Sequence, residues 1–198
     1  MTRLQEALVR LNADLTSLGL HWALVGGLAV SVYAEPRPTR DVDVAVAVSG
    51  DKQAEQVVYE LRRRGYRELP EQPILESVDS DRLATLRLLV PGNPGEEGSG
   101  IVADVLFSFS GVEPEIVKSA EPHEVFAGVA VPVIRSGELL AVKVQAGREK
   151  DLEDARNLLQ VLGEQDLQLA RDTLLLMDRR GFARGRDLLA ELARLQHP

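Results

Sequence analysis

Apolar and polar positions follow two different periods along the chain. Near the N-terminus leucines recur at helical spacing up to Leu15, which predicts a first helix that ends near Gly19. Residues 41–48, DVDVAVAV, instead place a valine at every second position, which is the pattern of a strand with one buried face. The chain is therefore expected to contain both helices and strands.

The same patterns give the order of the other elements. Further strands are expected at residues 22–25, 82–90, 100–109 and 129–134. Further helices are expected at residues 28–34, 51–65, 136–147, 149–162, 165–179 and 182–195. The two central strands, RLATLRLLV and GIVADVLFSF, are expected to form a hairpin whose long tip, PGNPGEEGSG, is a mobile surface loop.

The element types change near residue 135. Helices and strands are mixed before this point, and only helices follow it. We therefore predict an α+β fold with a mixed-sheet core domain at residues 1–135 and a C-terminal helical domain at residues 136–198.

Composition and charge narrow the class of protein. The chain has 198 residues, 44% of them apolar, and no apolar stretch approaches the roughly 20 residues of a membrane span. It contains no cysteine, which excludes disulfides, thiolate zinc sites and a cysteine nucleophile. We expect a cytoplasmic protein. The net charge of −8 disfavours a broad electrostatic grip on nucleic acid, although residues 171–198 carry six arginines against four acidic residues.

The strand at residues 41–48 carries an unusual pair of acids. Successive strand side chains point to opposite faces, so the valines share one face while Asp41 and Asp43 share the other. Two carboxylates this close raise each other's pKa unless a cation keeps them ionised. A divalent metal is the natural partner, because Mg²⁺ commonly takes one or two carboxylates together with substrate phosphate oxygens.

A third carboxylate is available on the strand expected at residues 100–109. Asp104 shares its strand face with Val102 and Leu106, and a lone acid among apolar residues needs a partner when buried. Two metal ions held by such a set can stabilise the attacking and leaving oxygens of a displacement at phosphorus. The alternative is structural: Asp41 and Asp104 would be solvated at strand ends, and Asp43 would cap a turn.

Gly26 and Gly27 lie where the first expected strand turns into a helix. Such a turn exposes backbone N–H groups, and the lack of side chains lets a phosphate approach them with help from the helix dipole. A glycine pair alone is more often only a tight turn. The acids that follow after one helix favour a phosphate site here.

These residues resemble a known superfamily. VGG, a short helix and then DVDV resemble the signature of the DNA polymerase β-type nucleotidyltransferases. RPTRDVDV and ELLAVKVQAGREKDLEDARNLL further resemble the AbiEii-type toxin branch, the nucleotidyltransferase halves of type IV toxin–antitoxin systems. The resemblance covers residues 20–162 in pieces and implies a polymerase β-like fold for the core.

The resemblance also implies metal ligands and a general base. Asp41 and Asp43 would hold both metal ions, Mg²⁺ or Mn²⁺. Asp104 would be the third ligand and the general base for the acceptor hydroxyl.

It implies triphosphate contacts in the same way. Gly26 and Gly27 would hold the triphosphate of an NTP, and Lys143 would contact it from the helix after the last strand. Many members have Ser where this chain has Gly27, so a hydroxyl contact is missing and backbone N–H groups would serve instead.

The stretch GREKDLEDARNLL has two interpretations. Arg148, Lys150, Asp151 and Asp154 include pairs three and four residues apart, which usually form a solvated, salt-bridged helix face. Alternatively, Arg148 or Lys150 neutralises phosphate while Asp151 orients one of them from behind.

We therefore expect a metal-dependent, toxin-like nucleotidyltransferase that joins a nucleoside monophosphate to an acceptor hydroxyl and releases pyrophosphate. The expected partners are an NTP, tRNA or another RNA or protein acceptor, and a cognate antitoxin protein. Two alternatives stay open: a small-molecule adenylyltransferase of the aminoglycoside type, and a binding module with a degenerate site.

Overall fold

The structure, a computed structural model, describes residues 1–69, 84–92, 99–109 and 112–196. Within these ranges the chain forms eight α-helices and a seven-stranded sheet. The strands are β1 (Trp22–Leu24), β2 (Asp41–Ala47), β3 (Arg67–Glu68), β4 (Ala84–Leu89), β5 (Val102–Ser108), β6 (Glu121–Phe126) and β7 (Val129–Val133). The helices are α1 (Arg3–Ser17), α2 (Gly26–Tyr33), α3 (Asp51–Arg63), α4 (Glu113–Lys118), α5 (Ser136–Ala146), α6 (Glu149–Leu159), α7 (Glu164–Arg179) and α8 (Leu188–Gln196).

The sheet is mixed and runs in the order β3-β4-β5-β2-β1-β7-β6. β2 lies near its middle, parallel to β5 and antiparallel to β1. β4–β5 and β6–β7 are antiparallel hairpins, and β1 pairs with β7 in parallel. The mixed sheet with separate helices confirms the predicted α+β class.

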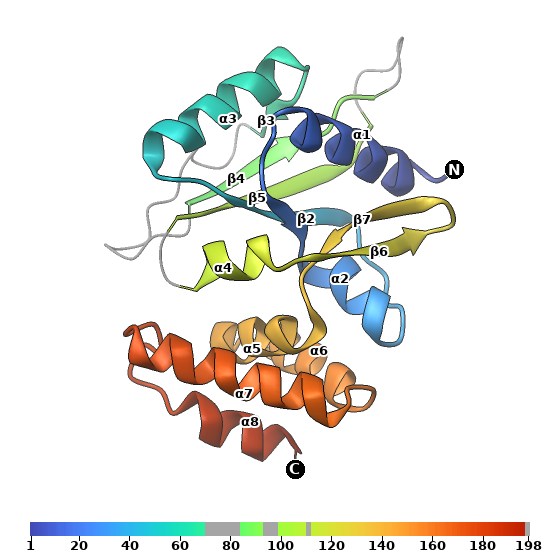
Figure 1. Ribbon diagram of the computed structural model, residues 1–198. Helices are drawn as coiled ribbons and strands as arrows, with labels where there is room; N and C mark the ends of the chain where they lie inside the picture. Colours follow the sequence, from blue (N-terminus) through green and yellow to red (C-terminus); the bar gives the residue numbers. More distant parts are fainter. Residues whose placement is uncertain (70–83, 93–98, 110–111, 197–198) are drawn as a thin grey trace.

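One face of the sheet is closed by α1 and α3, which lie above it in Figure 1. The alternation in β2 places Val42, Val44 and Val46 on this face, and all three are fully buried. They belong to one hydrophobic cluster with the leucines of α1 and the inward residues of α3. The valine face predicted from the sequence is therefore the packed face of β2.

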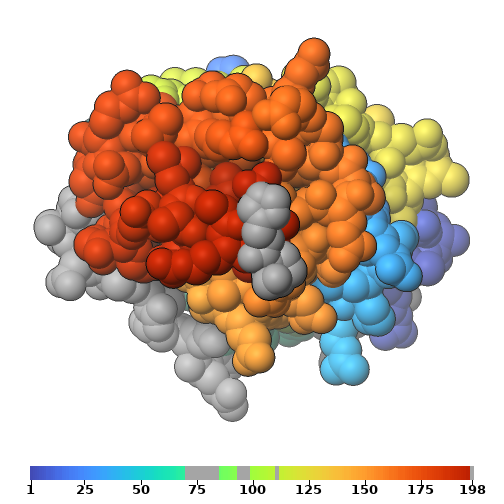
Figure 2. Space-filling view, turned by 90° about the horizontal axis from the view of Figure 1, so that it is seen from below, coloured from blue at the N-terminus to red at the C-terminus, as the bar shows by residue number. Residues whose placement is uncertain are grey.

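The other face of the sheet carries the acidic residues and is covered only in part. α4 packs over its small side chains, where Ala23, Ala45 and Val117 form a separate buried cluster. α5 to α8 form a helical layer below the sheet (Figure 1), and seen from below this layer covers most of the molecule (Figure 2). The end of β2 that carries Asp41 and Asp43 is left facing a cavity.

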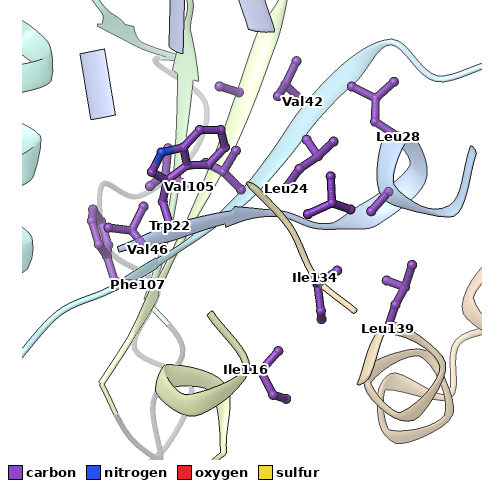
Figure 3. Close-up of a cluster of buried hydrophobic side chains, with 14 of the residues drawn as sticks. Trp22, Leu24, Leu28, Val42, Val46, Val105, Phe107, Ile116, Ile134 and Leu139 are labelled. Atoms are coloured by element: carbon purple, nitrogen blue, oxygen red, sulfur yellow. The ribbon is translucent and has the colours of Figure 1, made fainter. Parts of the chain in front are cut away.

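The helical layer and the sheet share buried contacts. Figure 3 shows Leu28 of α2, Ile116 of α4 and Leu139 of α5 in the same cluster as strand residues such as Leu24. Because α5 packs into the same hydrophobic cluster as the strands, its position relative to the sheet is set by buried contacts. The residues that α5 presents to the cavity are positioned in the same way. The domain boundary near residue 135 stays a prediction.

Particular residues set the ends of the helices. Thr2 caps α1 in a capping box, because its hydroxyl accepts from the N–H of Gln5 while the Gln5 side chain accepts from the N–H of Thr2. Gly147 ends α5 in the left-handed conformation at φ +67°, which turns the chain directly into α6. The residues of GREKDLEDARNLL are thereby folded back against α5.

The structure corrects several sequence predictions. α8 begins at Leu188 rather than at residue 182, because Gly181, Arg184 and Gly185 adopt positive φ and cannot continue a helix. α4, β3 and β6 were not predicted, since α4 has six residues, β3 has two, and the segment EPHEVF of β6 lacks strict alternation.

The hairpin of β4 and β5 is confirmed, while positions 93–98 of its tip and residues 82 and 83 lie outside the described residues. Among the described helices, none is both long enough and apolar enough to cross a membrane.

Candidate active site

Two acidic side chains of β2 and one of β5 lie on the same face of the sheet. β2 and β5 are parallel neighbours, and their register places Asp43 beside Asp104. Asp41 precedes Asp43 by two residues and therefore points to the same side of the strand. The structure thus brings the three predicted carboxylates together, although Asp41 is the first residue of its strand.

The turn from β1 into α2 is built by the two predicted glycines. Gly26 begins α2 at φ +66°, a conformation that side-chain-bearing residues rarely adopt. The N–H of Gly27 donates to Oδ2 of Asp43 at 3.4 Å. The N-terminal N–H groups of α2 therefore lie directly beside the carboxylates of β2.

All of these residues line one cavity of about 510 Å³. Its wall is formed by Gly26, Gly27, Arg37, Pro38, Thr39, Arg40, Asp41, Asp43, Arg87, Asp104, Lys143, Arg148, Lys150 and Asp151. The wall is strongly polar and holds six basic residues against four acids. A second cavity of about 550 Å³ lies between α7 and α8, but none of the predicted site residues lines it.

Lys143 reaches the cavity from α5 but already has two anionic partners. Its Nζ atom lies 2.9 Å from Oδ1 of Asp151 and 2.8 Å from Oδ2 of Asp154, both on α6. Asp154 also accepts two hydrogen bonds from Arg37, at 2.7 and 3.0 Å, and Asp151 accepts one from Arg148 at 2.6 Å. Positive and negative side chains therefore alternate in one connected network, in the order Arg37, Asp154, Lys143, Asp151 and Arg148. That Lys143 contacts the triphosphate stays a prediction.

The interpretation of GREKDLEDARNLL as a solvated helix face is wrong for Asp151 and Asp154. Asp151 is 3% exposed and Asp154 is 1% exposed. Burial would raise the pKa of Asp151, but hydrogen bonds from Arg148 and Lys143 outweigh it, so the pKa lies below its ordinary value. Asp151 holds Arg148 as the alternative interpretation expected, whereas the side chain of Arg148 itself is largely exposed.

Asp104 has a partner that the sequence prediction did not name. Arg87 of β4 donates from Nε to Oδ1 and from Nη2 to Oδ2 of Asp104, both at 2.7 Å. This fork raises the pKa of Arg87 above its ordinary value, chiefly through the hydrogen bonds to Asp104. Asp104 is thus a partly buried strand acid whose need for a counter-charge was predicted, and a guanidinium meets that need.

Asp43 carries the clearest electrostatic strain in the cavity. Burial raises its pKa, the nearby carboxylate of Asp104 raises it further, and the N–H of Gly27 opposes the rise. Among the ion pairs of the described residues, none involves Asp41 or Asp43. A cation bound between Asp41 and Asp43 would relieve the repulsion that Asp43 experiences from the neighbouring carboxylates.

The donor set fits Mg²⁺ or Mn²⁺ at Asp41 and Asp43. Two carboxylates together with phosphate oxygens of a substrate form an ordinary ligand set for Mg²⁺. Asp104 does not complete this set as it stands, because Arg87 binds both of its oxygens. In agreement, no group of three or more His, Asp or Glu side chains in the described ranges is arranged to hold a metal ion.

Three basic residues of the cavity wall escaped the sequence analysis as site residues: Arg37, Arg40 and Arg87. Arg87 stands alone among apolar residues in TLRLL, so the argument that singled out Asp104 applied equally to it. Arg37 lies between Pro36 and Pro38, and nothing in the local pattern indicates that its partner is Asp154, more than 100 residues away.

A family model for the nucleotidyltransferase AbiEii toxin of type IV toxin–antitoxin systems matches residues 7–197. The chain belongs to the AbiEii nucleotidyltransferase family. The match spans the sheet, the cavity and the helical layer, so this AbiEii-family protein is a nucleotidyltransferase enzyme. The resemblance drawn from VGG and DVDV is confirmed, and the degenerate binding module loses its support.

Solved structures with the same fold are distant in sequence. ANT(2'')-Ia in complex with adenylyl-2''-tobramycin has a TM-score of 0.58 at 14% identity, and the alignment covers 90% of this chain and 99% of that one. An antigenic nucleotidyltransferase-like protein from Paracoccidioides brasiliensis has a TM-score of 0.50 at 18% identity, with 96% and 92% covered. At these identities the similarity shows the fold of the AbiEii-family protein and not its substrate. No curated protein matches its sequence.

Proposed function

We propose that this AbiEii-family enzyme transfers a nucleoside monophosphate from an NTP to an acceptor hydroxyl and releases pyrophosphate. The observation that supports this most is the composition of the cavity beside β2 and β5. Its wall combines the Gly26–Gly27 turn, the carboxylates of β2 and β5, and a set of basic side chains. The backbone N–H groups and basic side chains can bind anionic phosphates, and the carboxylates can bind the cations that accompany them.

The proposed reaction forms one bond and breaks another at the α-phosphorus. The acceptor oxygen attacks that phosphorus, the bond to the bridging oxygen of the β-phosphate breaks, and the hydroxyl proton moves to a carboxylate. We assign the proton to Asp104, because it lies beside Asp43 and lines the cavity. The pyrophosphate leaves with the bridging oxygen.

The remaining residues would hold the reactants. Asp41 and Asp43 would bind Mg²⁺ or Mn²⁺, and Asp104 would become the third ligand once it leaves Arg87. When bound, the ion would neutralise phosphate charge and stabilise the oxygens that attack and leave. Gly26 and Gly27 offer backbone N–H groups to the triphosphate, and Lys143 adds a positive charge from α5.

The charge at the cavity favours an anionic acceptor such as the end of tRNA or of another RNA. Arg40 and Lys150 line the cavity, are exposed, and form no ion pair with any described residue. Free basic side chains attract the phosphates of an RNA backbone. They repel an aminoglycoside, which is itself a polycation, so the small-molecule alternative has less support from the charge of the wall.

The family match supports a toxin role. We propose that the enzyme modifies an RNA that growth requires, that a cognate antitoxin protein opposes it, and that it acts in the cytoplasm, where NTPs and RNA are found. Expression of the protein should then arrest growth, and Asp41→Asn should abolish the arrest. An arrest that persists in this variant at equal protein level would argue against a role for transfer.

A transfer assay tests the proposal directly. Purified protein is incubated with each α-labelled NTP, with Mg²⁺ or Mn²⁺, and with total RNA, purified tRNA or aminoglycosides. We expect label on RNA, and none when EDTA is added. Label on an aminoglycoside alone would establish the small-molecule alternative, and no label on any acceptor would contradict the proposal.

Asp104→Asn separates binding from transfer in the same assay. The amide keeps the shape of the side chain and loses the charge, so NTP binding should remain while transfer stops. Transfer at the wild-type rate would remove Asp104 from the mechanism.

A further inference from the structure

The ion pair between Arg87 and Asp104 is built into the register of three adjacent strands. β4 pairs with β5 so that Arg87 lies opposite Asp104, and β5 pairs with β2 so that Asp104 lies beside Asp43. One guanidinium and two carboxylates therefore follow one another across the sheet on the cavity face. This order is set by the backbone and does not depend on a flexible loop.

The contact uses both oxygens of Asp104. The two hydrogen bonds, from Nε and Nη2 of Arg87, are both 2.7 Å long and form a fork on the carboxylate. Asp104 is 15% exposed and Arg87 is 34% exposed at their side chains, so the pair is partly shielded from water. Forked pairs of this kind are stronger than single hydrogen bonds between the same groups.

A divalent ion and Arg87 cannot share Asp104 without cost. Both are cations, they would face the same two oxygens, and each would repel the other at close range. In the absence of metal, Arg87 neutralises one of three neighbouring carboxylates and so limits the repulsion among Asp41, Asp43 and Asp104.

We propose that Arg87 competes with the divalent ion for Asp104 and thereby sets the metal affinity of the site. This rests on the proposed role of Asp104 as third metal ligand. Asp41 and Asp43 bind the ion first, and Asp104 joins only when it leaves Arg87. The competition keeps metal affinity low in the absence of NTP, so that phosphate oxygens are needed to complete the ligand set.

Mn²⁺ binding without NTP tests the proposal, because it can be measured by electron paramagnetic resonance and needs no turnover. Arg87→Gln removes the competing charge and should tighten Mn²⁺ binding by about fivefold relative to wild type. Arg87→Lys keeps the charge but loses the fork, so it should tighten binding by a smaller factor. An unchanged or weaker affinity in both variants would overturn the proposal.

Two controls separate competition at Asp104 from a general effect of charge. Lys150→Gln removes one positive charge from the same cavity wall without touching Asp104, and it should change Mn²⁺ affinity by less than about twofold. In an Asp104→Asn background, Arg87→Gln should have no further effect, because the contested ligand is gone. A fivefold gain that persists in that background, or that Lys150→Gln reproduces, would show that Arg87 acts only through its charge.

Folding and function are followed separately. The melting temperature of each variant in metal-free buffer shows whether it folds, and Arg87→Lys is the variant to rely on if Arg87→Gln does not. The wild-type transfer assay reports on the proposed function independently. If the wild-type enzyme transfers nucleotide but the Arg87 variants bind Mn²⁺ as wild type does, only the proposed competition is wrong. If the Arg87 variants bind Mn²⁺ more tightly but the wild-type enzyme transfers no nucleotide, only the proposed function is wrong.

Discussion

Asp43 occupies the space that a side chain on Gly26 would need. A Cβ atom built on Gly26 would lie 2.0 Å from Oδ2 and 2.4 Å from Cγ of Asp43. Gly26 also has φ of +66°, so its backbone conformation and its surroundings both require glycine. The tight turn into α2 and the position of the central carboxylate therefore depend on each other.

Gly26→Ala should damage both stability and activity. The methyl group meets the carboxylate and the backbone is held at positive φ, so we expect a loss of about 2 kcal/mol in the free energy of unfolding. Thermal unfolding and the transfer assay measure the two effects. Gly27→Ala is the matched control for stability: its Cβ would meet Nη2 and Cζ of Arg37 at 2.9 and 3.2 Å and Oγ1 of Thr39 at 3.3 Å, so a small shift of side chains is enough to accommodate it and the loss should be smaller. Equal melting temperatures for Gly26→Ala and wild type would contradict this account.

Asp43→Asn should stabilise the metal-free protein while it abolishes transfer. The pKa of Asp43 is raised in the folded state by burial and by Asp104, so the folded protein holds this proton more tightly than the unfolded chain. The ionised carboxylate therefore lowers stability at pH 7, and the penalty fades as the pH falls through the folded pKa toward the ordinary Asp value of about 3.9. We expect the melting temperature of the variant in EDTA to exceed that of wild type by a few degrees at pH 7.

The pH dependence provides the check on Asp43. The gain from Asp43→Asn should shrink between pH 7 and pH 4, because wild type becomes protonated at that position and loses its penalty. A gain that is constant with pH would assign the effect to packing rather than to charge. Transfer activity above a few per cent of wild type would remove Asp43 from the metal site.

Asp154→Ala should be among the most destabilising changes in the helical layer. Asp154 is 1% exposed and binds both Lys143 and Arg37, so its removal leaves two cations facing a buried gap. Breaking a buried pair in this way costs about 3 kcal/mol. Chemical denaturation of the variant and of wild type measures the loss.

An exposed ion pair of the same layer is the control for Asp154. Glu164 binds Arg171 on α7, and its side chain is 77% exposed. Glu164→Ala should therefore change the free energy of unfolding by no more than about 0.5 kcal/mol. Losses of similar size for Asp154→Ala and Glu164→Ala would show that the buried network contributes no more than a surface pair.

Lys143 shows where the sequence alone misleads about stability. From the sequence, Lys143 is a helix residue beside a predicted phosphate site, and Lys143→Ala is expected to weaken NTP binding with little effect on folding. In the structure Lys143 is buried between Asp151 and Asp154, so the same change removes one cationic partner from each of two buried carboxylates and leaves them only Arg148 and Arg37. We now expect a lower melting temperature together with weaker NTP binding.

The carboxylates could be predicted because strand alternation is a local property. Asp41 and Asp43 fall on one face of β2 whatever the rest of the fold is, and the apolar neighbours of Asp104 indicate its need for a partner. The identity of that partner depends on the register of β4 against β5, which no local pattern specifies. The link between Arg37 and Asp154 depends in the same way on how α6 folds back against α5 and α2.

Arg37→Lys should weaken NTP binding with little effect on the chemical step. Nη2 of Arg37 lies 2.9 Å from the point where a Cβ on Gly27 would be, so the guanidinium stands over the first turn of α2, where a phosphate is expected to approach. The fork on Asp154 fixes it in that position. Lysine keeps the positive charge and can still meet Asp154, but it then has no second group for phosphate. We expect KM for NTP to rise about tenfold with kcat within about threefold of wild type.

Arg135→Lys is the control, because Arg135 forms a similar fork with Glu138 and does not line the cavity. If KM is unchanged in Arg37→Lys, or rises equally in both variants, Arg37 serves only to anchor α6 and the phosphate must be held by other residues of the wall.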